Sequence, residues 1–268
     1  MNKRFFTPEP RVFGHRGDSL NFPENTLPAF ASAVDMGVDV IETDVHRTRD
    51  GHFVVLHDDD MSRVTDGAGK ARDLTLEEIR RMDAGYRFTP DGQNFPFRGK
   101  GVTISTLEEV LAAFPQQRFN VDLKDNNPAQ ARDYCALIHR QNAEGRVLTA
   151  SEYSGNLKAV RKLLPEMATS ASRWEIMGVY FLFRSGLLVA KKRIAADALQ
   201  IPEFFGTSHV ASPGFIRALH RLGVKVHVWT VNREADMKRL LDAGADAIMS
   251  DDPALLKKVI AEHEPPRG

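Results

Sequence analysis

Two acidic residues and a histidine stand close together in the run IETDVHRTRDGHFVVLHD, residues 41–58. Glu42 and Asp44 are separated by one residue, so on a β-strand both carboxylates point to the same face, about 7 Å apart. Carboxylate oxygens arranged in this way suit a hard divalent cation, Mg²⁺ or Ca²⁺, better than they suit zinc. The plainer alternative is a hairpin whose acids are simply solvated.

The Asp-Gly dipeptide at positions 50 and 51 predicts that this run folds back on itself, because Asp-Gly is a strong signal for a two-residue hairpin turn. With these residues at the centre of the turn, Asp44 lies directly opposite His57. We therefore expect one hairpin to hold an imidazole against the pair of carboxylates. The histidines nearer the turn, His46 and His52, are expected to be exposed.

Further polar residues follow the ends of two other predicted strands. His15 and Arg16 come directly after the strand RVFG, and Asp122 and Lys124 lie two residues apart in NVDLKD. Side chains at the carboxyl ends of parallel barrel strands converge on one mouth. Each residue taken alone has an ordinary structural explanation. Together they favour a reaction centre, because burying so many polar groups without partners is costly.

Short β-branched runs alternate with helical patterns along the chain, which is typical of parallel strands joined by crossover helices. The predicted strands are Arg11–Gly14, Val38–Asp44, Phe53–His57, Arg118–Leu123, Arg146–Ala150, Met167–Ala171, Asp197–Ile201, Lys225–Val231 and Ala245–Met249. The predicted helices include Thr26–Met36, Pro128–Gln141, Gly155–Leu164, Pro213–Leu222, Glu234–Ala243 and Pro253–Glu262. At 268 residues the pattern fits either a (β/α)₈ barrel or a doubly wound open sheet.

The number of parallel strands decides between these folds. The link between Asp44 and Phe53 is too short for a crossover helix, so the strand that begins at Phe53 must return antiparallel. Eight strands remain, and we predict an α/β protein with a (β/α)₈ TIM barrel.

Residues 58–104 interrupt the alternation and are polar and rich in glycine. A capping box at Thr75–Glu78 opens one helix within them, and another at Thr106–Glu109 opens the helix that leads back to the barrel. We predict that residues 58–104 form a small, cap-like insertion after the hairpin that follows strand 2, within a single domain of residues 1–268.

The composition limits the partners. Lys and Arg number 36 and so do Asp and Glu, which argues against a nucleic acid as ligand. Cys135 is the one cysteine, so no intrachain disulfide forms. The N-terminus lacks the apolar core of a signal peptide, and no uninterrupted apolar run is long enough to cross a bilayer. We expect a cytoplasmic protein.

The segment Trp174–Ala190 is unusually apolar, although Glu175 and Arg184 interrupt it. We predict a core-facing barrel helix followed by an aromatic loop. The alternative is a lip that makes transient contact with lipid and accepts substrates with an acyl tail.

The motifs around these residues resemble, in order and over nearly the whole chain, those of the glycerophosphodiester phosphodiesterase family, which shares its barrel with the phosphatidylinositol-specific phospholipases C. The motifs are HRG (15–17), PENT (23–26), IETDV (41–45), VVLHD (54–58), DLK (122–124), WTVN (229–232) and GADAIMSD (244–251). The resemblance implies hydrolysis of a small glycerophosphodiester to sn-glycerol 3-phosphate and an alcohol, with one divalent cation as cofactor.

The resemblance also implies roles for single residues. His15 and His57 are expected to be the general acid and base, and Glu42, Asp44 and Asp122 are expected to hold the cation. Aspartate at position 122 departs from the family, where the third ligand is usually glutamate, and is similar to the spider-toxin phospholipase D branch. A lysophospholipase D-like activity is therefore the alternative among enzymes, and a non-catalytic binding protein is the alternative of another class.

Chemistry suggests roles for further residues. Arg16 and Lys124 are expected to bind phosphate oxygens, Arg as a planar fork and Lys as a point charge. Trp229 is expected either to wall the alcohol side of the pocket or to cap the barrel core. In PENT, Glu24 is expected to be structural and Asn25 to be the N-cap of the helix that follows.

Overall fold

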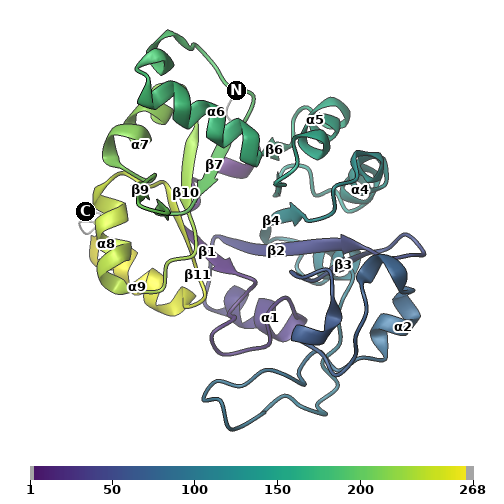
Figure 1. Ribbon diagram of the computed structural model, residues 1–268. Coiled ribbons are helices and arrows are strands. Elements are labelled where there is room, and N and C mark those ends of the chain that lie inside the picture. The colour runs from purple at the N-terminus through teal and green to yellow at the C-terminus, as the bar shows by residue number, and fades with distance from the viewer. Residues whose placement is uncertain (1–2, 264–268) are drawn as a thin grey trace.

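Eight parallel strands form the wall of a barrel in the order in which they occur in the chain (Figure 1). In the computed structural model, which describes residues 3–263, they are β1 (Val12–His15), β2 (Val40–Arg47), β4 (Arg118–Leu123), β5 (Val147–Ala150), β6 (Ala168–Thr169), β7 (Ala198–Ile201), β10 (Lys225–Val228) and β11 (Ala247–Ser250). β1 pairs with β11, and a bridge from Ser170 to Ala198 links β6 to β7, so the ring is nearly closed. The predicted (β/α)₈ barrel is confirmed.

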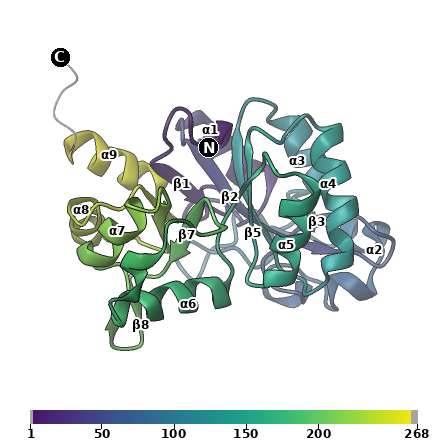
Figure 2. The ribbon, with the colours of Figure 1, turned by 90° about the horizontal axis from the view of Figure 1, so that it is seen from above.

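Helices surround this barrel on its outer side (Figures 1 and 2). They are α1 (Leu27–Asp35), α3 (Leu107–Ala113), α4 (Ala131–Arg140), α5 (Ser154–Leu163), α6 (Arg173–Arg184), α7 (Pro213–His220), α8 (Glu234–Asp242) and α9 (Pro253–His263). α4 shows why they dock, since Ala131, Tyr134, Cys135 and Ile138 form one buried stripe at helical spacing. Within residues 3–263, no helix is both long and apolar enough to cross a bilayer.

The hairpin after β2 forms as predicted, but its register differs by one residue. β3 (Phe53–Val55) runs antiparallel to β2, and Val45 pairs with Val55. The amide of Leu56 donates to the Asp44 carbonyl, so Asp44 lies opposite Leu56 and the predicted pairing with His57 is wrong. The turn is one residue longer than the dipeptide indicated, because the Thr48 amide donates to the His52 carbonyl and encloses a three-residue loop, residues 49–51.

The insertion at residues 58–104 packs against this hairpin, beside the barrel (Figure 1). It contains α2 (Leu76–Arg80) and two 3₁₀ turns, Met61–Arg63 and Ala71–Asp73, and both predicted capping boxes are present. Its apolar side chains form a separate cluster with two hairpin residues, Val54 and Leu56. Because the insertion shares its core with a barrel hairpin, we keep the proposal of a single domain.

The interior of the barrel is layered. At the base, a 3₁₀ turn at Arg4–Phe6 inserts Phe5 and Phe6 beneath Phe13, among the first residues of several strands. Above this aromatic plug lies a polar layer, in which Gln200 donates to Asn120 at 3.0 Å and lies 3.3 Å from Nδ1 of His227. The plug and the polar layer fill the lower barrel and leave space only towards the carboxyl ends of the strands.

Candidate active site

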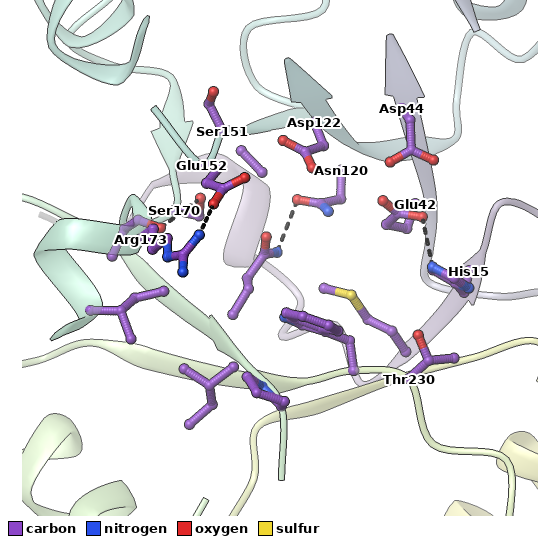
Figure 3. Close-up of a pocket in the computed structure, with 18 of the residues that line it drawn as sticks. His15, Glu42, Asp44, Asn120, Asp122, Ser151, Glu152, Ser170, Arg173 and Thr230 are labelled. Atoms are coloured by element: carbon purple, nitrogen blue, oxygen red, sulfur yellow. Dashed lines mark hydrogen bonds and ion pairs between the residues drawn. The ribbon is translucent and has the colours of Figure 1, made fainter. Parts of the chain in front are cut away.

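A cavity of about 590 Å³ opens at the carboxyl ends of the strands (Figure 3). All eight side chains that the sequence singles out line it, namely His15, Arg16, Glu42, Asp44, His57, Asp122, Lys124 and Trp229. Convergence of strand ends therefore holds for this whole set. Trp229 is 44% exposed at the cavity wall, so it does not cap the barrel core.

His15, the last residue of β1, is held by a carboxylate from the other end of the chain. Its Nδ1 lies 2.7 Å from Oδ1 of Asp251, which also accepts a hydrogen bond from Ser19, and Oδ2 of Asp251 accepts one from Asn232. Its Nε2 lies 3.9 Å from Oε2 of Glu42 (Figure 3). Burial opposes protonation, but the bond to Asp251 and the charge of Glu42 outweigh it and raise the pKa of His15. The imidazole thus has one nitrogen fixed and the other facing the cavity.

His57 has the same arrangement with a carboxylate beside it in sequence. Its Nδ1 lies 2.6 Å from Oδ1 of Asp58, whose other oxygen bonds to Arg63. Arg63 also donates two hydrogen bonds to Glu24, and Glu24 accepts a third from Arg16 at 3.0 Å. A chain of charged groups therefore ties the insertion to the β1–α1 loop across the site.

Asp251 and Asp58 are site residues that sequence reasoning missed. Both are the last residues of motifs quoted above, GADAIMSD and VVLHD. The signal for Asp58 was its place next to His57. For Asp251 no local signal exists, because its partner His15 lies 236 residues earlier in the chain.

The acidic pair on β2 is buried. Glu42 is 6% exposed and Asp44 1%. Burial, together with the neighbouring charge of Asp44, raises the pKa of Glu42 to about 7. Burial acts in the same direction on Asp44, but the positive charges of Lys124 and Arg16 prevail and lower the pKa of Asp44 to about 2. Asp44 is therefore ionised and already paired with Lys124 and Arg16, whereas Glu42 gains and loses its proton near neutral pH.

Lys124 bridges the pair to the third acid. Its Nζ lies 2.8 Å from Oδ1 of Asp44 and 2.7 Å from Oδ2 of Asp122, which are directly paired across β2 and β4. Oδ1 of Asp122 is buried and has no hydrogen-bond partner in the described part of the chain. As the side chains stand, no three Asp, Glu, His or Cys residues within 3–263 are spaced to hold a metal ion.

The donor set nevertheless fits a hard cation. It consists of carboxylate oxygens only, one of them buried without a hydrogen-bond partner among residues 3–263, and a bound cation would offset the burial and the charge of Asp44 that raise the pKa of Glu42. The ammonium of Lys124 lies between Asp122 and Asp44 of the acidic pair on β2.

Two expectations about neighbouring residues are wrong. Asn25 is not the N-cap of α1, because Thr26 accepts the hydrogen bond from the Ala29 amide. Asn25 has a left-handed backbone, φ 56°, and its side-chain amide donates to Oδ2 of Asp44 at 3.0 Å while accepting from Thr43. The αL conformation, which asparagine tolerates, turns its side chain inward to orient a candidate ligand.

His46 was expected to be exposed and is buried. Its Nδ1 lies 2.7 Å from Oδ1 of Asp125, and its Nε2 lies 3.1 Å from the carbonyl oxygen of His57. β2 extends to Arg47 and does not end at Asp44 as predicted, so His46 lies on the same face of the strand as Glu42 and Asp44. His52 is exposed, as expected.

The chain is similar to known proteins over most of its length. The profile of the Glycerophosphoryl diester phosphodiesterase family matches residues 15–255. The chain belongs to this family.

A glycerophosphodiester phosphodiesterase of Caldanaerobacter subterraneus is 34% identical, over 93% of this chain and 97% of that protein. A solved phosphodiesterase of Oleispira antarctica, in complex with the product sn-glycerol-3-phosphate, has 27% identity and a TM-score of 0.75, and covers 96% of this chain and 98% of its own. Among more distant members, a lysophospholipase D of Mus musculus is 27% identical over 92% of this chain and 85% of that protein.

Proposed function

We propose that this family member hydrolyses glycerophosphodiesters to sn-glycerol 3-phosphate and an alcohol, with a divalent cation, Mg²⁺ or Ca²⁺, and two histidines. The observation that carries the proposal is the pair of imidazoles on one cavity, each fixed at Nδ1 by its own carboxylate, His15 by Asp251 and His57 by Asp58. A carboxylate at Nδ1 sets the tautomer and leaves Nε2 for proton transfer.

The residues that would hold the cation are Glu42, Asp44 and Asp122. A divalent ion bound there supplies Lewis acidity to a phosphoryl oxygen. Arg16 and Lys124 border the same space and bind the remaining phosphate oxygens, whose negative charge grows as phosphorus is attacked.

The two histidines divide the proton transfers. One imidazole accepts the proton of the attacking hydroxyl, and the other donates a proton to the leaving alkoxide. The nucleophile is either water or the substrate hydroxyl beside the phosphate, which would give a cyclic phosphate that water then opens. His15 and His57 serve both routes.

The test is turnover of glycerophosphocholine, followed through release of sn-glycerol 3-phosphate. His15→Ala and His57→Ala should each lower kcat by about 10²–10⁴-fold with an unchanged circular dichroism spectrum. Chelation should abolish turnover, and Glu42→Gln should weaken its dependence on added cation. Near wild-type activity in either histidine variant would sink the acid/base assignment, and activity that survives chelation would remove the cation.

A lysophospholipase D-like activity is the second candidate, and one observation favours it. Away from the carboxylates, the cavity is walled by Ile176, Met177, Tyr180, Phe205 and Val210, apolar side chains that a glycerol head group does not require. The mouse relative carries this activity in its name. Assaying glycerophosphocholine, glycerophosphoethanolamine and lysophosphatidylcholine side by side separates the two, and a higher kcat/KM for the acylated substrate would make this the main activity.

A further inference from the structure

Large apolar side chains are exposed on one side of the cavity mouth. Of the eleven that are exposed among residues 3–263, seven fall between positions 174 and 205. They are Trp174, Met177 and Phe181 on α6, Leu187 and Val189 in the 3₁₀ turn after it, and Phe204 and Phe205 in the small hairpin β8 (Phe204–Phe205) and β9 (Ser208–His209). We call these seven residues the apolar rim. Figure 2 shows α6 and β8 along one edge of the molecule.

α6 faces the core as predicted, but its outer face is apolar as well. The predicted aromatic loop is wrong, because the aromatic residues of this segment lie on the helix itself. Val179 is buried, and Tyr180 packs edge-on against Phe215 with ring centres 5.3 Å apart. The opposite face carries Trp174 and Phe181, which are 69% and 70% exposed. A helix that only covers a barrel has a polar outer face. An outer face this apolar indicates contact with a partner.

Positive charge without partners borders the apolar rim. Residues 173–193 contain five basic residues and one acid, Glu175, in a chain whose total charge is zero. Glu175 is already engaged by Arg161 and by the cap of α6. Lys191, Lys192 and Arg193 are exposed, and their side chains make no hydrogen bond or ion pair with the described residues. Aromatic side chains next to unpaired basic residues are typical of surfaces that bind anionic membranes.

We propose that the apolar rim and Lys191–Arg193 together form a docking surface for a bilayer that contains anionic lipid. A second copy of the chain is a poorer occupant, because a two-fold interface would bring the same unpaired cations against one another. Arg173, Met177 and Phe205 also line the catalytic cavity, so a docked molecule has its cavity mouth at the lipid surface. The inference rests on this surface alone and not on the reaction proposed above.

The experiment is co-sedimentation of the full chain with vesicles of phosphatidylcholine alone and of equal parts phosphatidylcholine and phosphatidylglycerol. Wild type should bind the mixed vesicles, bind phosphatidylcholine much less, and be released by salt. Reversing the charge at Lys191, Lys192 and Arg193 should weaken binding by about 100-fold or more, at roughly fivefold for each cation removed. Phe181→Glu should weaken it by at least about tenfold.

Leu163→Glu is the matched control. Leu163 is 45% exposed at the far end of α5, which runs back from the mouth towards the base of the barrel, and its replacement should leave vesicle binding unchanged. Turnover of glycerophosphocholine in solution, measured on the same samples, should be unaffected by Phe181→Glu, which separates docking from catalysis. Failure of wild type to sediment with mixed vesicles, or equal losses in Leu163→Glu and Phe181→Glu, would overturn the proposal. A wild-type dimer that Phe181→Glu dissociates, without vesicle binding, would make the rim a subunit interface instead.

Discussion

Each candidate catalytic histidine depends on a carboxylate that never needs to touch the substrate. Asp251 holds Nδ1 of His15 at 2.7 Å. Burial opposes its ionisation, but the hydrogen bond and charge of His15 lower the pKa of Asp251 to about 2, so it is charged at neutral pH. Asp251 is therefore a positioning residue that also favours the protonated imidazole.

Asp251→Asn should lower kcat by about 10²-fold or more with little change in KM, because the imidazole loses its orientation. Since the bond to Asp251 raises the pKa of His15, its loss should move the limb of the pH–rate profile that reports His15 to lower pH. Steady-state kinetics across the pH range measure both effects. Asp242→Asn, at an exposed acid that pairs with His263, is the control. A fall in kcat without movement of the limb would indicate a structural role only.

Removing the charge of Lys124 should raise the affinity for Ca²⁺ and lower kcat/KM. Its ammonium contacts both Asp44 and Asp122, and like charges about 4 Å apart repel by roughly 4 kcal/mol at an effective dielectric of 20. Lys124→Met should therefore tighten Ca²⁺ binding at least about tenfold, while lowering kcat/KM through loss of a phosphate contact. Calorimetric titration and kinetics check this, with Lys162→Met as the control. Weaker Ca²⁺ binding in Lys124→Met would place the ion elsewhere.

At the scale of elements, the β1–α1 loop shows how local backbone geometry positions the site. Arg16, Gly17 and Asn25 all have positive φ angles. A Cβ at position 17 would lie 2.8 Å from the backbone of Ala29, so only glycine permits the close approach of this loop to α1. These turns bring Arg16 and the Asn25 amide against Asp44.

Substitutions of Asn25 separate the contribution of its side-chain amide to the free energy of unfolding from that of its left-handed backbone. Asn25→Gly keeps the left-handed backbone but removes the amide from a buried carboxylate, and should cost about 1–3 kcal/mol of unfolding free energy. Asn25→Ala should cost about 1 kcal/mol more, because alanine is strained at this φ. Urea denaturation measures both. Asn142, with φ 47° and an exposed side chain, supplies the matched Gly and Ala pair for the backbone cost alone. Equal stability of the two Asn25 variants would contradict the backbone part.

The order of strands, the hairpin and eight cavity residues could be predicted from the sequence because each depends on local pattern. β-branched runs and Asp-Gly turns are short-range signals. The register of the hairpin was not predictable from the dipeptide, because the loop has three residues, 49–51, where a two-residue turn was expected, and this shifts every pairing by one. Asp251 was missed, and an exposed apolar surface on Trp174–Ala190 was given only as the alternative, for another reason: a sequence shows that a side chain is acidic or apolar, but the fold decides which residues it contacts.

At the scale of the whole molecule, the polar layer inside the barrel links stability to pH. His227 is buried between Gln200 and the ring of Phe13, and burial lowers its pKa from 6.5 to about 4. Between these two pH values, His227 is protonated in the unfolded chain but not in the folded chain. The contribution of neutral His227 to the free energy of unfolding is therefore complete above about pH 6.5, and it is lost as the pH falls towards 4.

Wild type should lose about 3 kcal/mol of unfolding free energy from this group between pH 6.5 and 4. His227→Gln, which keeps an acceptor for Gln200, should show a shallower decline over the same range. Denaturant unfolding at a series of pH values compares the two slopes. Parallel curves would mean that His227 titrates normally in the folded chain.

The aromatic plug of Phe5 and Phe6 seals the base of the barrel, and Arg118 fastens it by donating to the Phe5 carbonyl. Substrate and products must therefore enter and leave the reaction centre through the same opening, the mouth of the cavity. Incoming diester and outgoing glycerol phosphate then exclude each other, and product accumulation should slow the enzyme competitively. When the enzyme is docked on a membrane, this opening faces the lipid surface, so the alcohol product is released there.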